Sequence, residues 1–353
     1  ASADDYVEAL RAAKVWVDMD SRREAIRDQI EAKAEALGGT ARVTEALLEE
    51  VTALVEWPVA IAGRIEGRFL QLPAEVIVAT VETNQRYFTV FDAEGRLLPA
   101  FITVSNIESR DVAQVIGGNE RVVRPRLADA LFFWEQDRRQ PLTDYLPRLD
   151  SITFQKALGS TGDKARRVAV LAAGIAAGSD ADVALVRRAA ELAKADLVTQ
   201  MVFEFPELQG IMGGHYARAG GEPDAVADAV AEHYQPVGAG TPIPATPVGR
   251  IVALADKLDT LVGFFAIDEK PTGSKDPYAL RRAALGIIRL IVENGLRLSL
   301  QAVFAKAGAK PAVVADLMAF FADRLKVAMR EQGVRHDLVS AVFALGNEDD
   351  LVR

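Results

Sequence analysis

Three arginines and a proline stand just ahead of an aromatic cluster in residues 117–134. The arginines are Arg121, Arg124 and Arg126, and Pro125 lies between the last two. A guanidinium group presents its N–H donors in a planar fork that fits the oxygens of a phosphate. The spacing therefore predicts phosphate binding at a helix start. The alternative is a solvated helix end in which the arginines pair with neighbouring acids.

Pro125 fits the first turn of a helix, where its missing N–H leaves no hydrogen bond unmade. Four apolar residues then fall on one face of that helix: Leu127, Ala130, Leu131 and Trp134. Because this face points elsewhere, we expect Arg124 and Arg126 to contact a phosphate or an acidic partner surface rather than to stabilise the fold.

A second group of cations is concentrated in residues 270–289 of a chain whose net charge is −9. If a helix begins at Asp276, the proline after it takes the first turn and the aspartate caps it. Lys275, Arg281 and Arg282 would then surround a helix start that can hold a phosphate. The preceding loop lacks the glycine spacing of a phosphate-binding loop, so an ordinary solvent loop is the alternative.

The second half of the chain resembles a metal-binding superfamily but lacks its histidines. Residues 163–172, the Ala195-Asp196 pair and Asp256 resemble, in this order, the metal-binding segments of the HD phosphohydrolase superfamily. That superfamily holds divalent metal with a histidine, a His-Asp pair and a distant aspartate. Lys164 stands where the first histidine is expected, and Ala195 replaces the histidine of the pair.

Neither an ammonium nor a methyl group supplies the neutral nitrogen donor that such a site needs. We therefore predict a degenerate site without bound metal, in which Asp196 and Asp256 are buried carboxylates and Lys164 pairs with one of them. The alternative is a weak, oxygen-rich Mg²⁺ site that also uses His215 or His233.

Other catalytic patterns give no candidate. The literal dipeptide His336-Asp337 lacks the flanking segments of a metal site, and we expect it in a surface loop or helix cap. The chain has no GxxxxGK[ST] loop, no GxGxxG after a strand and no GxSxG turn. No catalytic residue is therefore assigned.

Two differently built regions must position these side chains. Residues 1–150 are predicted to be α+β, with helices at 4–37 and 44–55, a strand region at 59–104 that includes a helix opening at Pro73, and a turn at 92–95. Residues 151–353 are predicted to be mostly helical and HD-like, with helices at 163–177, 182–205, 224–234, 247–265, 276–294 and 313–332. The chain is then predominantly α overall.

Composition narrows the class of protein. The chain has no cysteine, which excludes disulfides and thiolate metal sites. No apolar run is long enough to span a membrane, and the acidic N-terminus lacks the features of a signal peptide, so we expect a cytoplasmic protein. The acidic net charge argues against a uniformly basic surface but allows local basic patches.

Blocks along the whole chain resemble, in the family's order, the β subunit of the bacterial heterotetrameric glycyl-tRNA synthetase. They are residues 72–75, 85–88, 106–109, 117–134, 194–197, 201–213, 255–261 and 275–286. Family members carry a further N-terminal domain and a C-terminal anticodon-binding domain. We therefore expect this chain to be a middle fragment, with a first region similar to a B3/B4-type module.

The resemblance implies part of a glycine–tRNA ligase, which joins glycine to tRNA(Gly) while ATP becomes AMP and diphosphate. It places the adenylation site, with ATP and Mg²⁺, on a separate α subunit of an α2β2 enzyme, so we expect this chain to bind no cofactor. Its expected work is tRNA positioning and α-subunit docking through Arg86, Arg121, Arg124, Arg126, Lys275, Arg281 and Arg282. An HD-type phosphohydrolase and a purely structural scaffold are the alternatives.

Overall fold

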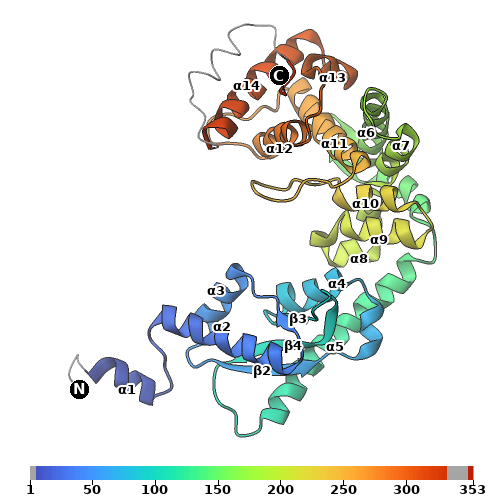
Figure 1. The fold of residues 1–353 in the computed structure, drawn as a ribbon. Coiled ribbons are helices and arrows are strands. Elements are labelled where there is room, and N and C mark those ends of the chain that lie inside the picture. The colour runs from blue at the N-terminus through green and yellow to red at the C-terminus, as the bar shows by residue number, and fades with distance from the viewer. Residues whose placement is uncertain (1–4, 332–348, 353) are drawn as a thin grey trace. The chain divides into compact units, whose positions relative to one another are not determined.

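The computed structural model describes residues 5–331 and 349–352 and divides into two compact units, Ala1–Gln136 and Asp137–Arg353 (Figure 1). The prediction of a predominantly α-helical chain with a smaller β component is confirmed. His336-Asp337 lies outside the described residues. In the described part, no helix combines the length and apolar character needed to cross a membrane.

The division between the units falls before the predicted boundary at residue 150, because Asp137 is built into the helical unit. Its carboxylate is buried and accepts hydrogen bonds from the N–H groups of Gln200 and Met201, at 3.0 and 2.9 Å. It also accepts one from the Tyr216 hydroxyl at 2.8 Å. Residues 137–150 therefore belong with the helices that follow them.

The first unit begins with two helices, α1 (Tyr6–Ala12) and α2 (Met19–Ala36), where a single helix over 4–37 was predicted. Lys14 between them has a left-handed φ of 63°, which ends the first helical path. The Asp18 carboxylate then accepts a hydrogen bond from Ser21 N–H at 2.9 Å and caps α2.

The first unit also contains an antiparallel sheet of strand order β1-β3-β4-β2. Its strands are β1 (Thr40–Ala41), β2 (Val59–Arg64), β3 (Phe88–Phe91) and β4 (Leu97–Ser105). The predicted turn joins β3 to β4, with Gly95 at a φ of 76°. Helix α2 and the predicted helix α3 (Glu45–Leu54) pack against the sheet and bury Ile26, Ile30 and Leu48.

Three short helical segments connect β2 to β3: η2 (Gly67–Gln71), α4 (Ala74–Val78) and the π-helix η3 (Ala79–Asn84). The predicted helix opening at Pro73 is confirmed, since Pro73 precedes α4 directly.

The expectation that Pro125 starts a helix is wrong, because it lies inside α5 (Val112–Asp137), a helix of 26 residues. The buried side of α5 continues across the proline, through Val123, Leu127, Ala130 and Trp134. A proline inside a helix costs about 3 kcal/mol. Burial of a large apolar side chain contributes about 1.5–3 kcal/mol, so these residues together outweigh that cost.

The second unit is helical apart from the two-stranded sheet of β5 (Thr153–Gln155) and β6 (Gly159–Ser160). Its helical segments are η4 (Leu142–Ser151), α6 (Thr161–Ala176), α7 (Val183–Leu192), η5 (Ala195–Val198), α8 (Gln200–Glu204), η6 (Pro206–Leu208), α9 (Ile211–Ala219), α10 (Asp224–Glu232), α11 (Pro247–Ala266), α12 (Leu280–Glu293), α13 (Leu300–Lys306) and α14 (Pro311–Glu331). Helix α11 is central and packs against α6, α7, α10, α12 and α14.

Two predicted helices of this unit differ from the structure. Residues 182–205 form α7, η5 and α8 rather than one helix, and the Thr199 hydroxyl caps α8 by accepting from Val202 N–H. The helix expected at Asp276 begins at Leu280, because Ala279 has a left-handed φ of 53°. The Asp276 carboxylate still accepts from Leu280 N–H and Arg281 N–H, at 2.8 and 3.0 Å.

Candidate functional site

A buried group of lysines and aspartates lies at the centre of the helical unit. Asp256 on α11 is 7% exposed, and Lys164 on α6 is 4% exposed. The Lys164 Nζ lies 3.2 Å from Asp256 Oδ1, and the Nζ of buried Lys194 lies 3.1 Å from Asp256 Oδ2. We refer to Lys164, Lys194, Asp256 and Asp259 as the lysine–aspartate cluster.

Asp259 is the second carboxylate of the cluster, nearly one turn after Asp256. Lys164 Nζ donates to Asp259 Oδ2 at 3.2 Å and to the Thr260 hydroxyl at 2.8 Å. Arg167 Nε donates to Asp259 Oδ1 at 2.8 Å. Asp256 therefore faces Lys164 and Lys194, and Asp259 faces Lys164 and Arg167. Of the two predicted partners of Lys164, Asp196 and Asp256, the structure shows Asp256.

Charge pairing outweighs the cost of burial at Asp256. Burial alone would raise the pKa of this carboxyl, but the ammonium groups of Lys164 and Lys194 hold the pKa well below its usual range. Burial lowers the pKa of Lys194, and the Asp256 carboxylate opposes that effect. Asp256 is thus ionised at neutral pH.

His233, at the end of α10, contacts this cluster as a neutral imidazole. Its Nδ1 lies 2.6 Å from Val230 O and its Nε2 lies 2.9 Å from Lys194 Nζ. With the proton on Nδ1, the ring donates to the carbonyl and accepts from the ammonium. Burial and the charge of Lys194 lower the pKa of His233 to about 3.

Asp196 serves a different purpose from Asp256. Its Oδ2 accepts hydrogen bonds from Gly210 N–H at 2.6 Å and Gly213 N–H at 2.9 Å, which holds the start of α9. Burial raises its pKa to about 6, and these two N–H groups oppose the shift. Ala195 is fully buried beside it, and His215 lies half-buried on α9.

This arrangement places cations where a metal site would need donors. The described residues contain no group of three or more histidines, aspartates and glutamates that could hold a metal ion. Two ammonium groups already neutralise Asp256, and the imidazole nitrogen of His233 is occupied by Lys194. The residues present therefore fit an internal ion-pair network rather than a divalent cation.

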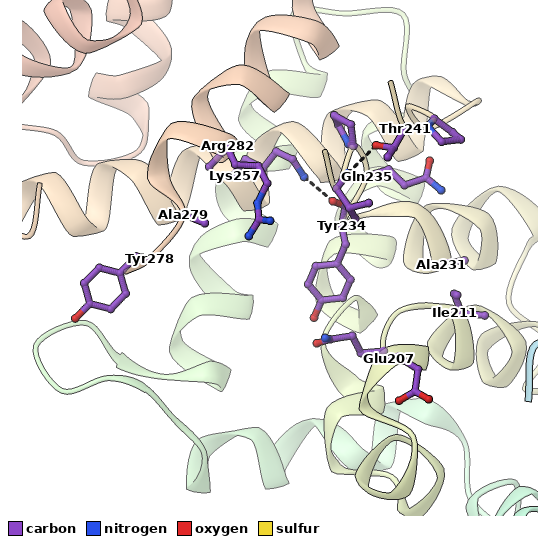
Figure 2. A pocket seen from close by; sticks show the side chains of 15 residues that line it. Glu207, Ile211, Ala231, Tyr234, Gln235, Thr241, Lys257, Tyr278, Ala279 and Arg282 are labelled. Carbon is purple, nitrogen blue, oxygen red and sulfur yellow. Dashed lines mark hydrogen bonds between the residues drawn. The ribbon is translucent and has the colours of Figure 1, made fainter. Parts of the chain in front are cut away.

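A pocket of about 620 Å³ opens beside this cluster, in the same unit (Figure 2). Lys257, the residue after Asp256, lines it and donates from Nζ to Tyr234 O at 2.9 Å. Burial lowers the pKa of Lys257 to about 8. Arg282, a predicted contact residue, also lines this pocket.

The predicted contact cations fall into two groups. Three are engaged: Arg86 pairs with Glu50 at 2.5 Å, Arg124 pairs with Glu66, and Arg281 donates to Gly273 O at 2.6 Å. The other four are exposed, and within the described residues their side chains have no ion pair or hydrogen bond: Arg121, Arg126, Lys275 and Arg282.

The sequence analysis missed Lys194, Asp259 and Lys257 as members of the buried network. Lys194 directly precedes the Ala195-Asp196 pair, and Asp259 follows Asp256 by three residues on a helix. Three charged residues within four positions of an otherwise apolar helix could have indicated Lys257 and Asp259, whereas Lys194 lies in the turn between α7 and η5. Their partners on other helices lie far away in the sequence, which no local pattern reveals.

The known proteins and the family model that match this chain all describe the same kind of protein. Residues 1–344 match the family model described as glycyl-tRNA synthetase beta subunit. The chain is 53% identical over 361 residues to a glycine–tRNA ligase beta subunit of Rhodospirillum centenum, covering 99% of this chain and 51% of that protein. It is 50% identical over 353 residues to the corresponding protein of Chromohalobacter salexigens, covering 98% of this chain and 51% of that protein. The chain thus spans about half the length of the curated relatives it matches.

Proposed function

The chain belongs to the glycyl-tRNA synthetase beta subunit family, and we propose that it positions tRNA(Gly) and docks the α subunit within a glycine–tRNA ligase. The whole enzyme would convert glycine, ATP and tRNA to glycyl-tRNA, AMP and diphosphate. We place adenylation, with its ATP and Mg²⁺, on the α subunit of an α2β2 assembly in the bacterial cytoplasm.

Of the seven predicted contact cations, four are exposed and have no side-chain partner in the described residues, and this observation supports tRNA binding. They are Arg121 and Arg126 in the first unit and Lys275 and Arg282 in the second. Arg86 and Arg124, by contrast, already pair with Glu50 and Glu66. Cations that the fold does not use are free to neutralise phosphates.

The lysine–aspartate cluster argues against a phosphohydrolase. A hydrolytic HD site needs open metal ligands, but the carboxylates of Asp256 and Asp259 are held by Lys164, Lys194 and Arg167. We propose that the cluster keeps the helical unit in one arrangement and takes no part in bond cleavage.

Two binding experiments test this function. Filter binding of tRNA(Gly) to the chain at several salt concentrations should show affinity that falls steeply with salt. A pull-down with separately expressed α subunit, with and without tRNA, should recover α. Retention of α without any salt-dependent tRNA binding would instead favour the structural scaffold.

A further inference from the structure

The pocket of Figure 2 has the size of a small-ligand site. Its volume of about 620 Å³ lies within the roughly 300–1,000 Å³ typical of such sites. Its walls come from η6 and the start of α9, the end of α10 with the loop after it, α11, and the start of α12. All of them belong to the helical unit, so the site is complete within it.

The charges that line the pocket favour an anion. Arg282 and Lys257 are its cations, and Glu207 is the one carboxylate among its lining residues. The Arg282 guanidinium points into the open part of the pocket, and it is unpaired within the described residues (Figure 2). Lys257 donates one N–H to Tyr234 O, so its ammonium group has two further donors for a ligand. A guanidinium fork beside an ammonium matches a phosphate.

The remaining lining residues favour a flat group that carries a hydrogen-bond donor. Gln235 Oε1 is buried and has no hydrogen-bond partner, so a ligand N–H or O–H would satisfy it. Pro236, Val237 and Ile211 add apolar surface. Tyr278 at the rim stacks on Phe264, with ring centroids 4.1 Å apart, and remains 39% exposed.

We propose that this pocket binds a single nucleotide, with its phosphate at Arg282 and Lys257 and its base or sugar donating to Gln235. Such a nucleotide could be a free nucleoside monophosphate or one unstacked nucleotide of an RNA. The RNA source rests on the proposed function, whereas the free nucleotide does not. The neighbouring lysine–aspartate cluster is internally paired, so it leaves the charge of Lys257 available to the ligand.

Isothermal titration of the whole chain at pH 7 with AMP, CMP, GMP, UMP and inorganic phosphate tests the site. At least one monophosphate should bind, more tightly than phosphate alone. Arg282→Gln should weaken this binding about tenfold or more, because a charge-assisted hydrogen-bonding group is lost.

Lys310→Gln is the matched control for this substitution. Lys310 is an exposed cation that precedes α14, and it is neither among the residues that line the pocket nor among the predicted tRNA contacts. Its replacement removes the same charge from the same unit. Monophosphate affinity should therefore change less than twofold in this variant, as expected for a charge outside the site.

Competition then identifies the source of the nucleotide. If a saturating monophosphate lowers tRNA affinity, an RNA nucleotide uses the same pocket; if tRNA affinity is unchanged, free nucleotides are the ligand.

The proposal is overturned if none of the four monophosphates binds at millimolar concentration, or if Arg282→Gln leaves binding unchanged while melting curves show a folded protein. Monophosphate binding without any tRNA binding would refute the proposed function and leave the pocket standing.

Discussion

Replacement of Asp256 by asparagine should strongly destabilise the helical unit. The change keeps the shape of the side chain but removes the anion that lies 3.2 Å from Lys164 Nζ and 3.1 Å from Lys194 Nζ. Both ammonium groups are buried, and Asp259 alone among their paired carboxylates would remain to balance them. Breaking a buried ion pair from one side costs about 3–5 kcal/mol, a large part of a typical stability of about 5–15 kcal/mol.

Urea unfolding of the wild type and of Asp256→Asn at pH 7 measures this loss. Asp150→Asn is the matched control, because Asp150 pairs with Arg166 at 2.8 Å on the surface, and its loss should cost no more than about 1 kcal/mol. Adding Lys194→Met to Asp256→Asn should recover part of the stability, since it removes one unbalanced charge. A loss no larger than that of the control would refute the reasoning.

The ion pairs of Asp256 also make the stability of the helical unit depend on pH. The pKa of Asp256 is depressed in the folded chain, so its contribution is fully present above the unfolded value of about 3.9. The contribution must then decline as the pH falls below that value. The unfolding free energies of the wild type and Asp256→Asn, measured between pH 6 and pH 3, should therefore begin to converge at the acidic end of this range.

Three further predictions address other parts of the chain. Gly213→Ala should destabilise by about 1–3 kcal/mol in urea, because its Cβ would lie 2.8 Å from Val230 Cγ1, whereas Gly174→Ala meets no atom within 4 Å and should not destabilise. NMR should show His233 neutral and protonated on Nδ1 from pH 5 to pH 8; a midpoint near 6.5 would contradict its lowered pKa of about 3. Arg126→Gln should change thermal stability by no more than about 0.5 kcal/mol while weakening tRNA binding; the reverse pattern would assign it to the fold.

The sequence predicted where helices occur better than it predicted the residues at which they begin. The apolar face of residues 44–55 correctly predicted α3, because a buried face leaves a local periodic pattern. Alanine- and leucine-rich composition correctly predicted α10 and α11. Pro125 and Asp276 misled the prediction of helix starts. At Pro125 tertiary burial outweighed a local breaker, and at Asp276 the cap reaches a helix that begins four residues later.

The sequence indicated which residues belong to the candidate site but not which groups their side chains contact. The resemblance to the HD superfamily related Lys164, Asp196 and Asp256, and the structure joins the first and last directly. It gives Asp196 a different purpose, because the backbone turn at Gly210 brings two N–H groups to its carboxylate. Such pairings depend on how helices pack, which the local sequence does not encode.

The salt dependence of tRNA(Gly) binding tests the central claim most directly. One variant carries glutamine at the four predicted contact cations that have no partner in the described residues, Arg121, Arg126, Lys275 and Arg282. It is compared with a variant that carries glutamine at four exposed arginines paired with acids, Arg68, Arg96, Arg166 and Arg218. Both variants lose the same charge. The account predicts that only the first variant loses affinity and that its plot of log affinity against log salt flattens by roughly one unit per lost phosphate contact. Equal slopes for both variants and the wild type would contradict it.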